Sequence, residues 1–124
     1  MGVADLDRTT KFYTEIGIKP NGTHSSKELR SFFFGDDEFV IHFFLKDILK
    51  SSMKGELADL TNGSEVLYTL SASSKEEVDN WETAVNKAGG TIISLPEEFG
   101  NGYYGFNFAD PDGHRFNVFY MKGL

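Results

Sequence analysis

The chain has no cysteine and few basic residues, and both absences narrow what it can do. Without cysteine it forms no disulfide framework and offers no thiolate nucleophile or metal ligand. It carries 12 Lys and Arg against 19 Asp and Glu, for a formal net charge of −7 over 124 residues. No basic stripe exists to neutralise phosphates, so we expect no nucleic-acid partner.

Long apolar runs are also missing. No stretch approaches the length that spans a bilayer, and the first residues lack the basic and apolar regions of a secretory signal. We therefore expect no membrane partner and a cytoplasmic location. No Gly-rich phosphate loop, nucleophilic Ser motif or Cys/His pair is present either.

Aromatic residues are abundant instead, with 12 Phe, 5 Tyr and 1 Trp. A chain of this length fits one domain, residues 1–124, and folding buries roughly two thirds of its unfolded surface. We expect some of the rings to line a pocket in addition to filling the core.

A hairpin near the C-terminus is the clearest local signal. Two alternating aromatic runs, residues 104–109 and 115–120, flank Asp110-Pro111-Asp112-Gly113, which suits a type I turn. Residues 31–34 and 39–44 flank the acidic turn Asp36-Asp37-Glu38 in the same way. The chain is therefore predicted to contain the same unit twice.

Each hairpin follows a predicted helix. Residues 5–16 begin at the N-cap candidate Asp5, and residues 74–88 begin at the capping-box residues Ser74 and Glu77. Each helix is followed by a Gly and a short extended segment, residues 19–23 or 91–95. A strand at residues 65–72 precedes the second helix, whereas only residues 1–4 precede the first. A short helix is expected within the linker, residues 46–60.

This pattern resembles the vicinal oxygen chelate superfamily, which includes glyoxalase I, bleomycin-resistance proteins and extradiol dioxygenases. The resemblance rests on the duplicated order, residues 5–13 of the first helix, and the closing Asp-Pro-Asp-Gly-His at 110–114. It is strongest to small bacterial glyoxalase-like proteins.

The resemblance implies an α+β fold of paired βαβββ modules that form a curved, cup-shaped mixed sheet. Module one would cover residues 1–45, a linker residues 46–64 and module two residues 65–124. The first strand of module one is largely absent. Either the protein begins upstream, or residues 1–4 form a vestigial strand, or a second chain covers the gap. Superfamily members often dimerise, so a homodimer is expected.

The resemblance also implies four metal-ligand positions, on the first and fourth strands of each module. One falls before Asp5, the second on His42, the third near Leu67 and the fourth on Asn117. Leu67 cannot bind a metal, and the Asn117 amide is a weak ligand, so we predict no complete site for Zn, Ni, Mn or Fe. His42 is the single metal candidate.

Ligand-binding residues are predicted on the inner face of the cup. By alternation His42 shares a strand face with Phe44, and it could bind a ligand, act as a general base or be structural. A few polar side chains on an otherwise apolar wall are typical of small-molecule pockets. The predicted ligand-binding residues are His42, Phe44, Thr69, Phe106, Asn117 and Phe119. No catalytic residue is assigned.

Other candidates have simpler explanations. His114 is expected to face the helix side and to be structural, and Asp110 and Asp112 are expected to be turn residues. His24 has no evident partner in the sequence. The Gly-containing segment 96–102 is predicted to be a loop that controls access to the cup.

Three functions are compatible with these patterns. The first is binding of a small organic molecule in the aromatic cup without a complete metal site, as bleomycin-resistance proteins do. The second is a metal-dependent lyase, isomerase or dioxygenase whose ligands are completed by upstream residues or a partner subunit. The third is a protein-interaction or structural role with the cup packed shut. We favour the first.

Overall fold

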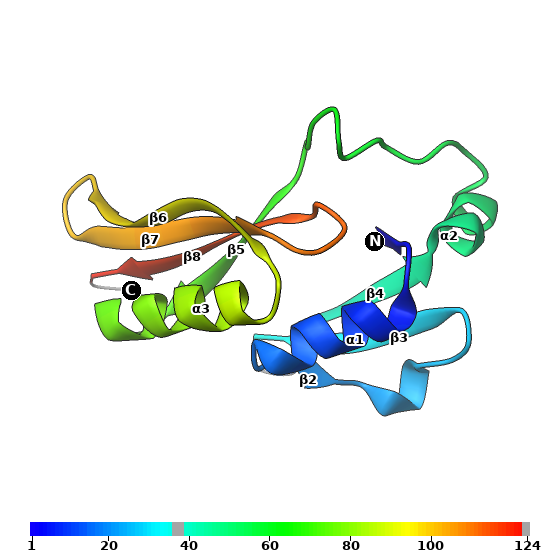
Figure 1. Cartoon of the computed structure of the whole chain (residues 1–124), viewed down its shortest axis with the longest axis horizontal. Helices are drawn as coiled ribbons and strands as arrows, with labels where there is room; N and C mark the ends of the chain where they lie inside the picture. Colours follow the sequence, from blue (N-terminus) through cyan, green and yellow to red (C-terminus); the bar gives the residue numbers. More distant parts are fainter. Residues whose placement is uncertain (36–38, 123–124) are drawn as a thin grey trace. The chain divides into compact units, whose positions relative to one another are not determined.

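The computed structural model describes residues 1–35 and 39–122, and these divide into two compact units, residues 1–60 and 61–124. Each unit has its long helix against one face of its own four-stranded sheet (Figure 1). The α+β class and the repeated βαβββ order are confirmed. The predicted acidic turn Asp36-Asp37-Glu38 lies outside the described residues.

Unit 1 contains β1 (Gly2–Val3), α1 (Leu6–Glu15), β2 (Lys19–Pro20), a 3-10 turn η1 (Gly22–His24), β3 (Leu29–Phe34), β4 (Phe39–Leu45) and α2 (Lys46–Met53). Its strand order is β1-β4-β3-β2, with β1 parallel to β4 and the other pairs antiparallel. The linker helix predicted after the first hairpin is therefore confirmed as α2, which packs against β1 and β4.

The first strand of unit 1 is short but present. Gly2 and Val3 pair in parallel with Phe44 and Leu45, and the Phe44 N–H donates to the Met1 carbonyl at 2.8 Å. Val3 is fully buried. Residues 2 and 3 therefore form a short strand, as one of the alternatives for this segment supposed.

Unit 2 contains β5 (Leu67–Ala72), α3 (Lys75–Lys87), β6 (Thr91–Phe99), β7 (Tyr103–Ala109) and β8 (Arg115–Met121), in the sheet order β5-β8-β7-β6. Here the prediction for residues 96–102 is wrong in part. The strand β6 continues to Phe99, and only a tight turn with Gly100 and Gly102 at positive φ separates it from β7. Cross-strand pairing with β7 outweighs the Pro and Gly signals.

Both long helices begin at the predicted caps. The Asp5 carboxylate accepts the Arg8 N–H at 3.0 Å, and the Ser74 hydroxyl accepts the Glu77 N–H at 3.0 Å. These caps satisfy backbone donors that the first helical turn leaves free. Each helix ends before a Gly with φ of +92°, a conformation that favours Gly.

Two aromatic-rich cores hold the helices on their sheets. In unit 1 the Tyr13 ring packs against three sheet rings, with centroid distances of 5.6 Å to Phe32, 6.0 Å to Phe34 and 4.6 Å to Phe43. In unit 2 the buried α3 residues Val78 and Val85 cover sheet residues that are also buried: Phe106, Phe108, Phe116 and Val118.

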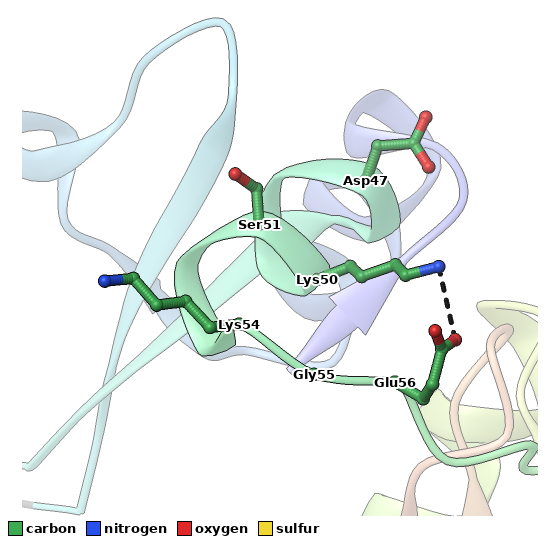
Figure 2. A pocket seen from close by; sticks show the side chains of 6 residues that line it. All are labelled: Asp47, Lys50, Ser51, Lys54, Gly55 and Glu56. Atoms are coloured by element: carbon green, nitrogen blue, oxygen red, sulfur yellow. Dashed lines mark ion pairs between the residues drawn. The ribbon is translucent and has the colours of Figure 1, made fainter.

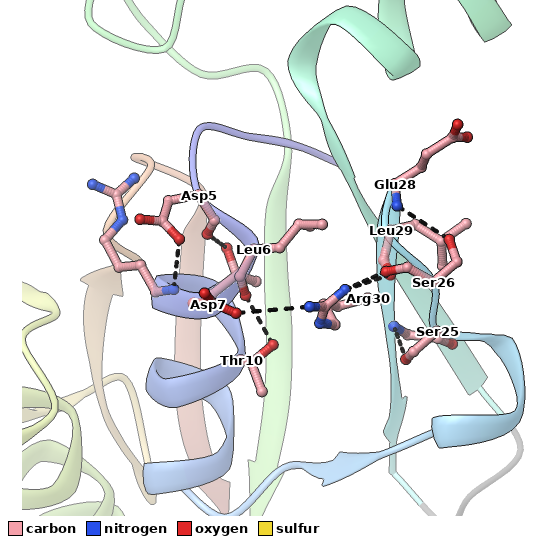
Figure 3. Close-up of polar contacts among 12 residues, drawn as sticks. Asp5, Leu6, Asp7, Thr10, Ser25, Ser26, Glu28, Leu29 and Arg30 are labelled. Carbon is pink, nitrogen blue, oxygen red and sulfur yellow. Dashed lines mark hydrogen bonds and ion pairs between the residues drawn. The ribbon is translucent and has the colours of Figure 1, made fainter.

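A polar contact adds to the helix–sheet packing of unit 1. Figure 3 shows Arg30 on β3 reaching Asp7 on α1, with a nitrogen–oxygen distance of 3.7 Å, and donating to the Ser26 carbonyl. Asp7 is highly exposed, so the ion pair itself contributes little to stability. The guanidinium instead orders the loop that leads from η1 into β3.

Candidate functional site

The face of each sheet that its long helix leaves uncovered, called the open face below, carries most of the predicted residues. In unit 1, Ile41 and Phe43 point into the core, whereas Val40, His42 and Phe44 alternate to the open face. The predicted pairing of His42 and Phe44 on one face is confirmed, with ring centroids 6.0 Å apart.

His42 has a neighbour that the sequence did not reveal. The 3-10 turn η1 brings the His24 ring to a centroid distance of 6.4 Å from His42, with 31° between the ring planes. The main chain of His42 is also fixed, because its carbonyl accepts the Met1 amine at 2.6 Å. Only a tertiary contact brings these imidazoles together, so spacing along the chain could not predict it.

A row of polar residues crosses the open face of unit 1 next to His42. Ser31 pairs with His42 across β3 and β4, and the Asn21 amide donates to the Ser31 hydroxyl at 3.3 Å. The Ser31 N–H donates to the Ser25 hydroxyl at 3.3 Å. Asn21 and Ser31 are 6% and 1% exposed, and their side chains are hydrogen-bonded to each other. This polar row is satisfied within the unit.

The open face of unit 2 carries a corresponding polar row, in which the contacts differ. Register places Thr69 beside Asn117, Asn117 beside Asn107, and Asn107 beside Ser94, so the row crosses β5, β8, β7 and β6. The Asn107 N–H donates to the Ser94 hydroxyl at 3.2 Å, where register shifts interrupt the β6–β7 ladder. We call these four residues the unit 2 polar row.

Two acceptors in the unit 2 polar row have no hydrogen-bond partner. The Oδ1 atoms of Asn107 and Asn117 are both buried and unpartnered, and Asn117 is 5% exposed. Buried polar groups are nearly always paired in folded proteins, and exceptions call for an explanation. Alternation from Asn117 across the Asp-Pro-Asp-Gly turn would have identified Asn107, which the sequence analysis missed.

Aromatic rings lie beside the unit 2 polar row. The Phe119 ring is 4.5 Å from the Phe99 ring, which is 5.6 Å from the Tyr103 ring. Gly105, opposite Phe119, leaves the space for this arrangement: a Cβ there would lie 2.1 Å from Phe119 Cδ1. These rings, tilted by 47° and 38° to one another, form an apolar surface, called the aromatic floor below.

The prediction for Phe106 is wrong in its placement. Phe106 is 1% exposed and lies on the face covered by α3, where its ring stacks on Phe108 at 5.7 Å. Because neighbours along a strand point to opposite faces, it cannot share a surface with Asn107 or Asn117. Its role is core packing. The remaining predicted residues, His42, Phe44, Thr69, Asn117 and Phe119, all lie on open faces.

A cavity of about 450 Å³ adjoins the aromatic floor in unit 2. It is lined by Ser71, Ala72, Ser73, Glu77, Phe119, Tyr120 and Met121. The Glu77 carboxylate accepts hydrogen bonds from the N–H and the hydroxyl of Ser73, and these bonds lower its pKa below the usual 4.5. The cavity therefore has one ionised carboxylate near neutral pH.

A second hollow, of about 490 Å³, lies beside α2 (Figure 2). Its lining includes Asp47, Lys54 and the ion pair between Lys50 and Glu56, whose nitrogen and oxygen are 3.2 Å apart. The side chains of that pair are 52% and 86% exposed, and no predicted site residue lines the hollow. Exposed, mutually paired charges are typical of a solvated surface.

The family model of the Glyoxalase/Bleomycin resistance protein/Dioxygenase superfamily matches residues 1–118. The chain belongs to this superfamily. The match spans both units, in agreement with the resemblance found in the sequence. No curated protein matches the chain.

Solved structures of superfamily proteins are similar to this chain. A hypothetical protein from S. aureus is 27% identical with a TM-score of 0.84, covering 98% of this chain and 89% of that one. A glyoxalase-related enzyme from Fulvimarina pelagi is 21% identical with a TM-score of 0.85, covering 97% of this chain and 83% of that one. Lactoylglutathione lyase from Agrobacterium tumefaciens is 21% identical with a TM-score of 0.70, covering 100% of this chain and 92% of that one. At such identities the likeness shows the fold.

The residues at the ligand positions implied by the superfamily do not fit a metal ion. Leu67, half exposed at the start of β5, has no donor atom, and Asn117 offers only a neutral amide oxygen. Within residues 1–35 and 39–122, no group of three His, Cys, Asp or Glu side chains is placed to hold a metal. His42 and His24 alone fall short of the four-ligand sets that hold Zn in structural sites.

His114 and Asp110 close the C-terminal hairpin as predicted. Asp110 Oδ1 accepts the N–H groups of Asp112 and His114 at 3.0 and 2.8 Å, and Oδ2 lies 2.7 Å from His114 Nδ1. Gly113 donates to the Asp110 carbonyl at 3.0 Å, which completes the turn. These residues are structural, because their polar atoms bind one another.

A separate polar cluster joins α3 to β6 and β7. Lys75 pairs with Glu98 and lies 5.6 Å above the Tyr104 ring, and the Tyr104 hydroxyl donates to Asp79 at 2.6 Å. The hydrogen bond to Asp79 raises the pKa of Tyr104, and the hydrogen bond to Glu98 raises that of Lys75. These groups sit on the surface and pair among themselves, so they hold the helix rather than a ligand.

None of the helices in the described part of the chain combines the length and the apolar character that crossing a bilayer requires.

Proposed function

We propose that this superfamily member binds a small organic molecule on the open face of unit 2 and uses no resident metal there. The single observation that carries the proposal is the pair of buried, unpartnered oxygens on Asn107 and Asn117, next to the aromatic floor. A few polar groups set against apolar and aromatic walls are the usual composition of a ligand site.

Each part of the face has a role in this proposal. The Phe119 and Phe99 rings would supply apolar contact area, and the amide oxygens of Asn107 and Asn117 would orient the ligand by hydrogen bonds. Thr69, at the exposed end of the unit 2 polar row, would add a hydroxyl. His42 and Phe44, on the open face of unit 1, stay predicted ligand contacts.

The test is a titration of metal-free, isotope-labelled protein with a set of small aromatic fragments, followed by amide NMR shifts. We expect the shifts to centre on Gly105, Asn107, Asn117 and Phe119. Phe119→Ala should weaken binding, whereas Phe39→Ala, which removes a ring that is 57% exposed on β4, should not. Shifts that centre on the hollow beside α2 would contradict the proposal.

The metal-dependent alternative is tested in parallel. Metal content of the purified protein is measured, and thermal stability is followed with Zn, Ni, Mn and Fe(II). A stoichiometric metal, or a stabilisation that His42→Ala abolishes, would favour a glyoxalase-like lyase or a dioxygenase over the binding function.

A further inference from the structure

The hydrogen-bond pattern around Asn107 shows how it faces Asn117, the other residue whose side-chain oxygen has no partner. The Asn107 N–H points toward β6, where it meets Ser94, and thus away from β8. Asn107 and Asn117 are therefore a non-hydrogen-bonded antiparallel pair, the type in which facing Cβ atoms approach to about 5 Å. Two carboxamides at this separation can bind two adjacent atoms of a single ligand.

The polarity of the site follows from which atoms lack partners. Both orphan atoms are oxygens, so the groups that complement them are N–H or O–H donors. The two amides do not satisfy each other, since neither Oδ1 accepts a hydrogen bond. A ligand with paired donors on one edge would satisfy both oxygens at once.

The surroundings favour a planar ligand. Gly105, two residues along β7 from Asn107, is covered by the Phe119 ring, and Phe99 extends the aromatic floor. Aromatic rings pack well in offset or edge-on geometry against such a surface. Glu77 in the adjoining cavity would attract a cation, whereas Arg115, on the open face two residues from Asn117 and on the side away from Phe119, would attract an anion.

We propose that the unit 2 polar row selects a planar aromatic ligand that carries two N–H donors on one edge, as a urea or an amidine does. This inference rests on the proposed binding function and specifies its ligand class. The donor edge meets the oxygens of Asn107 and Asn117, and the ring lies on Phe119. The opposing possibility is a carboxylate ligand, held by Arg115 and by the amide nitrogens.

Two probes of similar size separate these possibilities. Phenylurea presents two N–H donors on one edge, and benzoate presents two acceptors on the same ring. The dissociation constant of each is measured by NMR titration of the full chain. We expect phenylurea to bind at least about tenfold more tightly than benzoate, with shifts at Asn107 and Asn117.

Variants test the role of the oxygens. Asn117→Leu keeps the approximate size but removes the acceptor, and should weaken phenylurea binding about three- to tenfold, the loss expected for one hydrogen bond. Asn117→Asp restores an acceptor and should recover the binding. The matched control is Asn80→Leu on the exposed surface of α3, which should leave the affinity unchanged.

The outcomes distinguish failure of this inference from failure of the proposed binding function. If benzoate binds as tightly as phenylurea, or if Asn117→Leu leaves phenylurea affinity unchanged, the donor-edge inference is overturned while aromatic binding at Phe119 still stands. If neither probe binds and no fragment shifts the open face of unit 2, both this inference and the proposed function fail.

Discussion

The two units place polar rows at corresponding positions of their sheets, but only one row is satisfied. In unit 1 the Asn21 amide donates to Ser31, beside His42. In unit 2 the residues at the corresponding strands, Asn107 and Asn117, leave their oxygens without partners. The same framework therefore stabilises itself in one unit and keeps free acceptors in the other.

The difference bears on the free energy of unfolding and on where a ligand would bind. A polar group that is buried without a partner lowers stability by about 1–3 kcal/mol, whereas a paired one contributes modestly. Departures from such local rules are expected at functional or strained sites, and each unpaired buried group calls for an explanation. Unit 2 is therefore the better candidate for binding a ligand, although the sequence alone draws attention to His42 in unit 1.

The largest expected contrast lies in the cores. Phe43 and Val118 occupy corresponding positions on β4 and β8, and both are fully buried. Phe43→Ala should lower the unfolding free energy by about 3–5 kcal/mol, because a ring-sized cavity replaces contacts with Tyr13 and Phe32. Val118→Ala should lower it by about 2 kcal/mol. Urea unfolding followed by circular dichroism measures both losses. Equal losses would show that the aromatic packing around Phe43 stabilises the protein no more than the aliphatic packing around Val118.

The next contrast concerns two glycines. A Cβ on Gly105 would lie 2.4 Å from the Val118 carbonyl oxygen and 2.1 Å from the Phe119 ring, whereas one on Gly22 meets nothing within 4 Å. Gly105→Ala should therefore destabilise the protein by about 1–3 kcal/mol through overpacking. Gly22→Ala should change stability by less than about 0.5 kcal/mol. Thermal unfolding of the two variants tests this, and a harmless Gly105→Ala would contradict the close approach of Phe119.

Substitutions in the two polar rows should change the unfolding free energy in opposite directions. Ser31→Ala leaves the buried Asn21 amide without its acceptor, and should lower the unfolding free energy by about 1 kcal/mol. Asn117→Leu removes an orphan acceptor, and should leave stability unchanged or raise it by up to about 1 kcal/mol. Both values come from urea titrations at neutral pH. A clear loss of stability in Asn117→Leu would show that its oxygen has a structural role.

The smallest expected difference in stability between the units is at the N-termini of the two long helices. Glu77 accepts hydrogen bonds from Ser73, whereas Arg8 occupies the corresponding position of α1 and cannot accept them. Because the folded-state pKa of Glu77 is lowered, its stabilisation is present above about pH 4.5 and is lost as the pH falls through that lower pKa. Glu77→Gln should lower the unfolding free energy by about 0.5 kcal/mol at pH 7, since the group is partly exposed to solvent, and by less at pH 3.

Unfolding curves at the two pH values measure this effect. Arg8→Gln is the matched control, and it should not show the same dependence on pH. A Glu77→Gln loss that is equal at pH 3 and pH 7 would assign the effect to something other than carboxylate ionisation.

Local rules predicted the framework well. Caps at Asp5 and Ser74 and the turn at Asp110–Gly113 depend on neighbours within a few residues, and the structure confirms them. The extent of β6 was missed because Pro96 and the nearby glycines indicate a loop, whereas residues 97–99 pair with residues 103–105 across a tight turn. Phe106 was misplaced because alternation has a period of two, so a shift of one residue moves a side chain to the other face.

The site was harder to predict than the fold. His24 and His42 lie close together only in the tertiary structure, and the Asn107 N–H meets the Ser94 hydroxyl where the β6–β7 register is interrupted. A composition or a motif contains no information about which polar atoms remain unpaired. That property emerges only when the strands are in register.

The irregular β6 has a consequence for association between molecules. It is an edge strand of its sheet, and its outer backbone groups could pair with a strand from another molecule. Register shifts on both sides of Ser94 distort it, Pro96 removes a donor, and the exposed Glu97 and Glu98 add negative charge. The same distortion that draws Ser94 toward Asn107 therefore protects this edge against strand addition and aggregation.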